Sequence, residues 1–316
     1  MSKRNKHYLR TRKRKRFFES MKPLSKNALI GYPAGIITGI SYGLNPLFGM
    51  PLMRQGAEVE SILFFRYGIA VLILGAVLLC DRQRFKITWR QAGILLVLGL
   101  LYTASSVTLF EAYKYIPSGL ATTFVFLYPV LVALIMVFLR VIPSWQVWLA
   151  IVATFVGVII MTQSGDTHHI NPLGVVLSIG SALVYALFIV IINRSRAISA
   201  IPSSLLTFYT LCVGAVVFLT RIGMSGTDML AGITTKLDWL NLVGLALLPT
   251  IVSTATLAVA TRNIGATKAS VLGVFEPITA ILVGTLVFGE ALTNNIILGI
   301  TIAMVAVTFM IISTKR

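Results

Sequence analysis

Two charged residues stand alone inside long apolar stretches, and either one has the chemistry to hold a small charged molecule. Arg66 falls in the stretch at 60–80, and Glu276 falls near the middle of the stretch at 269–288. A charge within a bilayer is costly, so it usually faces a cavity or a partner. We predict that Arg66 receives a substrate carboxylate or pairs with an acid. Snorkelling of its long side chain toward an interface is the other interpretation.

Glu276 directly precedes Pro277, where a helix loses one backbone hydrogen bond. A carboxyl group in a low-dielectric site can exchange protons near neutral pH. We therefore predict that Glu276 lines the same cavity as Arg66 and either couples transport to protons or holds a substrate ammonium group. A structural hydrogen bond at the proline break is the alternative.

Aromatic hydroxyls and prolines also fall inside the apolar stretches. Buried tyrosine hydroxyls need partners, which makes them candidates to line a cavity; these are Tyr42, Tyr102, Tyr128 and Tyr185. Tyr128 precedes Pro129 just as Glu276 precedes Pro277, so these two prolines are candidate helix breaks beside the cavity. A simple packing kink is equally compatible with the pattern. Pro46 and Pro249 offer further breaks, and Ser106 and Thr254 further polar positions.

Motifs for other chemistry are missing from the sequence. There is no HExxH, GxSxG or GxxxxGK[ST] pattern, so the sequence gives no support for a protease, a hydrolase or an ATP-driven pump. Cys80 and Cys212 are isolated and predict packing positions rather than a disulfide or a metal site. His168 and His169 form a pair without further ligands. We expect no cofactor and no metal.

The composition is that of a protein dissolved in lipid. Of 316 residues, 57% are hydrophobic and 12% are charged, whereas a soluble domain carries roughly a quarter charged residues. A membrane span takes about 20 apolar residues. The sequence predicts ten such spans, at 28–53, 60–80, 91–112, 118–139, 145–162, 171–192, 203–220, 239–261, 269–288 and 294–313.

Basic residues are distributed unevenly along the chain. Residues 1–27 form a basic tail, and with this tail in the cytoplasm 22 Lys and Arg lie inside and four lie outside. Positive residues are retained on the cytoplasmic side, so both termini are predicted to be cytoplasmic in an inner or plasma membrane. The tail also suits contact with anionic lipid, and we do not expect nucleic acid as a partner.

The two halves of the chain resemble each other. Residues 112–129 align with 260–277 at an offset of 148, and the first and sixth predicted spans align at an offset of 139. Each half, 28–164 and 169–316, would hold five spans, so the second half enters the membrane inverted. Inverted repeats are typical of secondary transporters, whose substrate site lies between the repeats near the midplane.

Three segments carry a resemblance to a known family. They are FFRYGIA (64–70), EAYKYIPSGLATTFVFLYPV (111–130) and ATKASVLGVFEPITAILVGTLVFGEALT (266–293). The sequence resembles the EamA-type members of the drug/metabolite transporter superfamily, which have ten helices and two EamA repeats. It departs from the repeat where Arg140-Val141-Ile142 stands in place of a Gly-Glu pair such as Gly289-Glu290. The resemblance implies a transporter, often an exporter, of amino acids, related metabolites or drugs.

We therefore expect an all-α integral membrane protein that exports a small metabolite such as an amino acid by alternating access, and not an enzyme. Protons are a candidate coupling ion. The alternatives are a membrane-bound enzyme acting on a lipid-linked substrate, which would need clustered acids or histidines near one interface, and a receptor or scaffold, which would need a sensing domain or long loops.

A glycine stripe is predicted to pack against another helix rather than bind ligand; it comprises Gly31, Gly35, Gly39 and Gly43.

Overall fold

The computed structural model describes residues 26–81, 85–140, 145–162, 170–198, 200–226, 228–264, 269 and 272–313. All regular structure in these ranges is helical. The helices of the first half are α2 (Lys26–Gly43), α3 (Asn45–Arg54), α4 (Val59–Cys80), α5 (Trp89–Ala112), α6 (Ser118–Val125), α7 (Tyr128–Phe138) and α8 (Trp145–Thr162).

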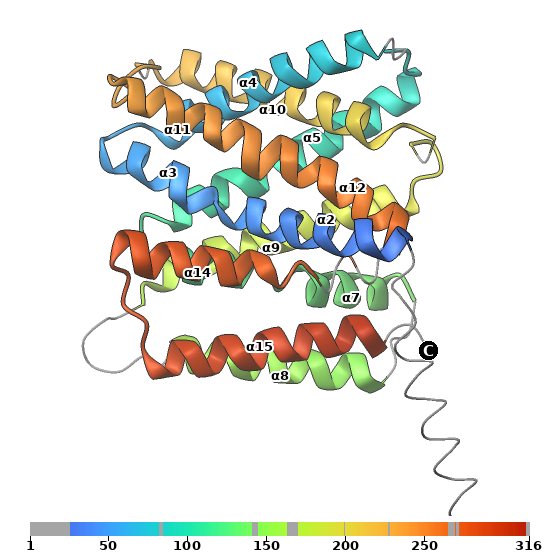
Figure 1. The fold of residues 1–316 in the computed structure, drawn as a ribbon, viewed down its shortest axis with the longest axis vertical. Helices are drawn as coiled ribbons and strands as arrows, with labels where there is room; N and C mark the ends of the chain where they lie inside the picture. The colour runs from blue at the N-terminus through green and yellow to red at the C-terminus, as the bar shows by residue number, and fades with distance from the viewer. Residues whose placement is uncertain are drawn as a thin grey trace, which may run out of the picture.

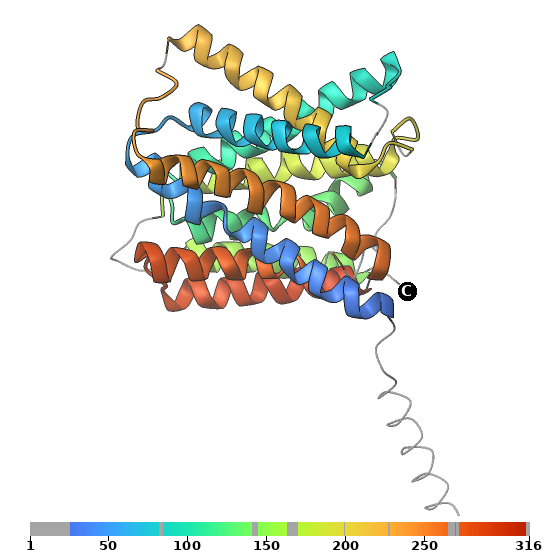
Figure 2. The same cartoon turned by 45° about the horizontal axis from the view of Figure 1, so that its top comes forward.

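The second half is built in the same way. Its helices are α9 (Pro172–Arg194), α10 (Ser203–Ser225), α11 (Lys236–Ala246), the π-helical turn η1 (Leu247–Val252), α12 (Ser253–Ile264), α14 (Phe275–Phe288) and α15 (Asn294–Ser313). The long helices lie side by side, with α4 and α10 at one edge of the bundle and α8 and α15 at the other (Figure 1 and Figure 2).

The two ends of the bundle can be told apart by the chain ends. We call the end where α2 begins and α15 finishes the terminal end; it is on the right in Figure 1. The other end, which holds the connections from α3 to α4 and from α14 to α15, is called the opposite end.

Helices of the first half pack mainly on helices of the second half. The pairs are α2 with α12, α5 with α9, α4 with α10, α6 with α14, and α8 with α15. A contact between α2 and α14 also has a counterpart between α9 and α7. The interface between the halves therefore runs through the whole bundle.

Apolar length is sufficient for a membrane span in six described segments. These are Val59–Cys80, Trp89–Ala112, Ser118–Phe138, Pro172–Ile192, Ser203–Ser225 and Lys236–Thr261. The other four predicted spans coincide with the interrupted pair α2 and α3 and with the shorter apolar parts of α8, α14 and α15. The prediction of an all-helical membrane protein is thus confirmed. The sequence analysis did not predict how many of the spans are interrupted.

Three interruptions are followed at once by a proline. The chain turns at Leu44, at 126–127 and at 273–274, and the next helix carries Pro46, Pro129 or Pro277 in its first turn. The first amides of a helix have no intrahelical acceptor, so a proline costs little there. The prolines therefore begin new helical segments rather than bend continuous ones.

The glycine stripe of α2 packs as predicted. A Cβ atom added at Gly35 would lie against Leu272, and one added at Gly39 would lie 2.9 Å from the Cβ of Phe275. At Gly43 the added atom would be 2.5 Å from the carbonyl oxygen of Glu276 and 2.7 Å from the Cβ of Thr279. Only a residue without a side chain lets α2 approach α14 this closely.

We predict that Gly43→Ala lowers the free energy of unfolding by about 1–3 kcal/mol, because the new methyl group meets a backbone carbonyl that cannot move aside. Gly68→Ala in α4 is the control, since nothing lies within 4 Å of a Cβ added there. The thermal midpoint in detergent would be measured for both variants. Equal midpoints for the two variants would contradict this packing.

Candidate functional site

A pocket with a volume of about 410 Å³ lies among helices from both halves. Its lining comes from α2, α5, α9, α10 and α12, and from the connection between α9 and α10. Ser203 and Thr261, at the terminal end, are exposed. The pocket therefore runs from the middle of the bundle to the terminal end.

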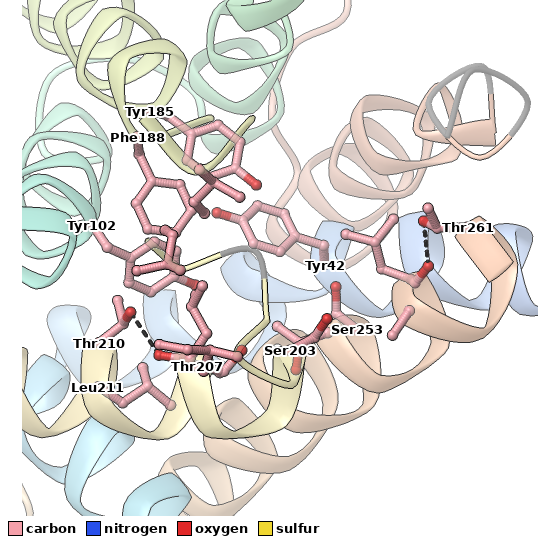
Figure 3. Close-up of a pocket in the computed structure, with 17 residues that line it drawn as sticks. Tyr42, Tyr102, Tyr185, Phe188, Ser203, Thr207, Thr210, Leu211, Ser253 and Thr261 are labelled. Atoms are coloured by element: carbon pink, nitrogen blue, oxygen red, sulfur yellow. Dashed lines mark hydrogen bonds between the residues drawn. The ribbon is translucent and has the colours of Figure 1, made fainter. Parts of the chain in front are cut away.

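Aromatic rings form the inner end of this pocket. Figure 3 shows Tyr42, Tyr102, Tyr185 and Phe188 gathered there, whereas serine and threonine hydroxyls of α10 and α12 line the remainder. Three of the four tyrosines predicted from the sequence thus line one cavity.

The hydroxyl groups of these tyrosines differ from those of nearby tyrosines in their hydrogen bonding. The hydroxyl groups of Tyr67 and Ser106 are 2.6 Å apart, and those of Tyr113 and Thr122 are 3.2 Å apart, so these tyrosines already have partners. The hydroxyls of the four predicted tyrosines form no hydrogen bond with another residue in the described parts of the chain. A phenol can donate and accept one bond at once, so these groups are available to a ligand.

Tyr128 joins this group indirectly. Its ring centroid lies 5.1 Å from that of Tyr185, which in turn stacks on Phe188 at 5.8 Å. Phe188 is 5.5 Å from Tyr102, and Tyr102 stacks on Tyr67 at 5.9 Å. A continuous row of rings therefore runs from α7, through the inner end of the pocket, to α4.

Arg66 lies beside the end of this row and is buried, with only 2% of its surface exposed. This burial rules out the snorkelling interpretation. Its guanidinium carbon is 5.9 Å from the ring centroids of both Tyr67 and Phe110, within the range of cation–π attraction. The Nη2 atom is buried and has no hydrogen-bond partner among the described residues.

No described acid neutralises Arg66. The two ion pairs in the described parts of the chain are Lys114 with Glu111 and Arg221 with Glu60. A buried, unpaired charge is expensive unless something else offsets it. Arg66 does not line the 410 Å³ pocket, although Tyr67 beside it stacks on Tyr102, which does.

A helix defect holds Arg66 in place. Pro249 has no amide hydrogen to donate to the carbonyl of Leu245, and the helix widens into the π-turn η1 at this point. The Thr250 hydroxyl donates to that carbonyl at 3.1 Å and accepts a hydrogen bond from Arg66 Nε at 2.9 Å. One hydroxyl thus repairs the defect and orients the guanidinium group.

Glu276 is half-buried in the first turn of α14. It does not line the 410 Å³ pocket, but its backbone carbonyl lies against Gly43, the residue after the pocket-lining Tyr42. No ion pair joins Glu276 to Arg66 in the described parts of the chain.

Other predicted positions fall away from the pocket. Pro129 and Pro277 do not line it, although each follows a helix break near the tyrosines or Glu276. Cys80 is exposed at the end of α4, and Cys212 is half-buried in α10. Residues 163–169, which include His168 and His169, lie outside the described residues. No cluster of possible metal ligands occurs among the described side chains.

Several lining residues were not predicted from the sequence. Phe188 follows Tyr185 by about one helical turn, and Ser253 is the repeat equivalent of Ser105 at the offset of 148. Thr207 and Thr210 carry no sequence signal, because threonine in a helix usually donates to its own backbone, as Thr210 does to Leu206 at 2.8 Å.

The fold and pocket define an all-helical membrane protein with an internal solute-sized site. A family model described as the EamA-like transporter family matches residues 29–163 and 172–312. The chain belongs to this family, as the sequence resemblance predicted, and it is a membrane transporter by family.

Relatives in three bacteria carry transporter names without a stated substrate. An uncharacterized transporter of Synechocystis is 26% identical over 71% of this chain and 67% of its own length. One from Clostridium kluyveri is 22% identical over 90% of this chain and 94% of its own. One from Bacillus subtilis is 28% identical over 57% of this chain and 58% of its own length. A solved crystal structure has the same fold, with a TM-score of 0.63 at 14% identity over 90% of this chain and 98% of that one.

We predict that Thr250→Val destabilises the protein by about 2 kcal/mol or more, because the carbonyl of Leu245 and Arg66 Nε both lose their partner. Thr254→Val is the matched control, since the Thr254 hydroxyl donates only to carbonyls of its own helix, at Thr250 and Ile251. Thermal midpoints would be compared in the same detergent. If Thr250→Val costs no more than Thr254→Val, the hydroxyl does not hold Arg66.

Proposed function

We propose that this protein is a secondary transporter that exports a small metabolite bearing a carboxylate, such as an amino acid or a related compound, by alternating access. The observation that carries the proposal is the pocket between the two halves, which runs from the middle of the bundle to the terminal end and places polar hydroxyls around a solute-sized space. Sites of this kind between repeats are typical of secondary transporters.

The proposed architecture is ten spans arranged as two inverted five-helix repeats. The recurring helix pairs support it, because an inverted twofold relation exchanges the α2–α12 pair with the α9–α5 pair. The same exchange relates the α2–α14 contact to the α9–α7 contact. The two family matches and the matching breaks at 126–127 and 273–274 agree with this relation.

The charge distribution bears on the direction of transport. The basic tail and the excess of Lys and Arg at the terminal end favour a cytoplasmic position for that end. A pocket open there is accessible to cytoplasmic solute, as export requires. Export is the proposed direction.

Arg66 and Glu276 are the proposed charged contacts. Arg66 has a buried, unpartnered Nη2 behind the row of rings and would bind the carboxylate once the bundle rearranges. Glu276 would hold an ammonium group or exchange a proton with each cycle. Tyr42, Tyr102, Tyr185 and Tyr128 would supply neutral hydrogen bonds and aromatic surface for the solute.

We predict that reporter fusions after residue 166 read external and fusions after residue 316 read cytoplasmic. With both termini inside, the connection between the fifth and sixth spans must lie outside. A cytoplasmic reading at 166 would contradict the inverted repeat and the proposed direction together.

We predict that Arg66→Ala abolishes solute flux in proteoliposomes while leaving the protein inserted and monodisperse. The solute would first be identified by a thermal-shift screen against amino acids, nucleosides and sugars. Arg66→Lys should recover little flux, because an ammonium group cannot match the planar two-donor geometry of guanidinium. Arg221→Ala, which breaks an exposed ion pair, is the control. Wild-type flux in Arg66→Ala would remove this residue from the site.

Glu276 is tested by the dependence of flux on pH. If it carries a proton, Glu276→Gln should lose the pH dependence, and Glu276→Asp should retain part of it. If it holds an ammonium group, Glu276→Gln should instead weaken binding of cationic solutes only. A variant that keeps both the rate and the pH profile of the wild type would leave Glu276 as a structural residue at the helix break.

A further inference from the structure

A carboxylate from the second half closes the opposite end of the bundle on the first half. Glu290 Oε1 accepts hydrogen bonds from the backbone amide of Ser118 at 2.7 Å and from the Ser118 hydroxyl at 2.6 Å. Its Oε2 atom accepts from the Gly119 amide at 3.2 Å. These amides begin α6, so the negative charge lies at the positive end of a helix dipole.

The surrounding backbone is shaped for this contact. A Cβ added at Gly119 would lie 2.8 Å from the Cα of Ile281, and one added at Gly284 would collide with the Glu290 carboxylate. Gly289 ends α14 with a φ of +68°, which turns the chain so that Glu290 points back at α6. Glycines at these places allow α6 and α14 to meet without intervening side chains.

A second contact closes the same side of the bundle. The Ser181 hydroxyl donates to the carbonyl of Ser105 at 2.7 Å, and the two hydroxyls are 3.0 Å apart. This pair joins α5 to α9 about two turns from the opposite end. The repeat equivalents of Ser105 and Ser181 are Ser253 and Tyr42, and these two line the open pocket. The pair on one side is thus joined by hydrogen bonds, whereas no hydrogen bond joins Tyr42 to Ser253 on the other.

The first half lacks the matching carboxylate. Arg140, with a φ of +62°, follows α7 in the left-handed conformation that Gly289 adopts after α14. The sequence then continues Val141-Ile142, residues outside the described ranges, with no acid where the second half has Glu290. Only one end of the bundle can therefore be fastened by this contact.

We propose that Glu290 is a one-sided latch that holds the opposite end shut and sets the resting conformation with the pocket open at the terminal end. The inference rests on the proposed function, since a latch matters only if the bundle alternates. To open the opposite end, the carboxylate must leave two amides and one hydroxyl. Each hydrogen bond to a charged group that is lost without replacement shifts the population ratio by about tenfold or more.

The test measures conformation without any solute. Spin labels at Tyr115→Cys and Leu292→Cys report the opposite end, and labels at Ser203→Cys and Thr261→Cys report the terminal end; all four positions are exposed. Cys80→Ser and Cys212→Ala remove the native thiols. Distance distributions in nanodiscs should show Glu290→Gln raising the population with a long 115–292 distance at least about tenfold.

Two further variants make the result specific. Glu60→Gln removes an acid from the same end, where it pairs with exposed Arg221, and should leave the distribution unchanged. Ser118→Ala removes the hydroxyl donor only and should shift the population in the same direction by less, which keeps the test decisive if Glu290→Gln does not fold. Wild-type distributions in both latch variants would overturn the proposal, and so would an equal shift in Glu60→Gln. Because flux is not measured, failure of the transport proposal would appear separately, as wild-type flux in Arg66→Ala.

Discussion

Backbone hydrogen bonding within an apolar bundle is the constraint on which the rest of this structure depends. Hydrocarbon offers no partner for a free carbonyl or amide, so every helix break must be satisfied by protein or must border a cavity. Pro249 creates such a break, and the Thr250 hydroxyl repairs it by donating to the Leu245 carbonyl. The same hydroxyl accepts from Arg66 Nε, so it also orients the buried guanidinium group of α4.

The helix breaks lie beside acidic and hydroxyl-bearing side chains. Three helices restart just before a proline, and the residues beside these restarts include Glu276 and Tyr128.

Two acids of the second half have no counterpart in the first half. Glu276 lies at a helix break in one half, and the aligned residue in the other half, Tyr128, has a neutral hydroxyl. Glu290 fastens α6 at one end of the bundle, and the first half offers no equivalent acid. In the proposed cycle an exactly symmetric pair of repeats would favour neither open state, and these unmatched residues would supply the energy difference between the two states.

The sequence by itself determined the membrane class, the two-part repeat and the identity of the charged residues, because apolar length and isolated charge are properties of the chain order. It also selected Tyr42, Tyr102 and Tyr185, which line the pocket, and Tyr128, which does not. Only the tertiary structure decided that Arg66 is buried without an acid, because pairing depends on which helices meet. The contacts of Thr250 with Arg66 and of Glu290 with Ser118 join residues 184 and 172 positions apart. No local sequence pattern predicts contacts between residues so far apart along the chain. These contacts form because the two halves pack against each other.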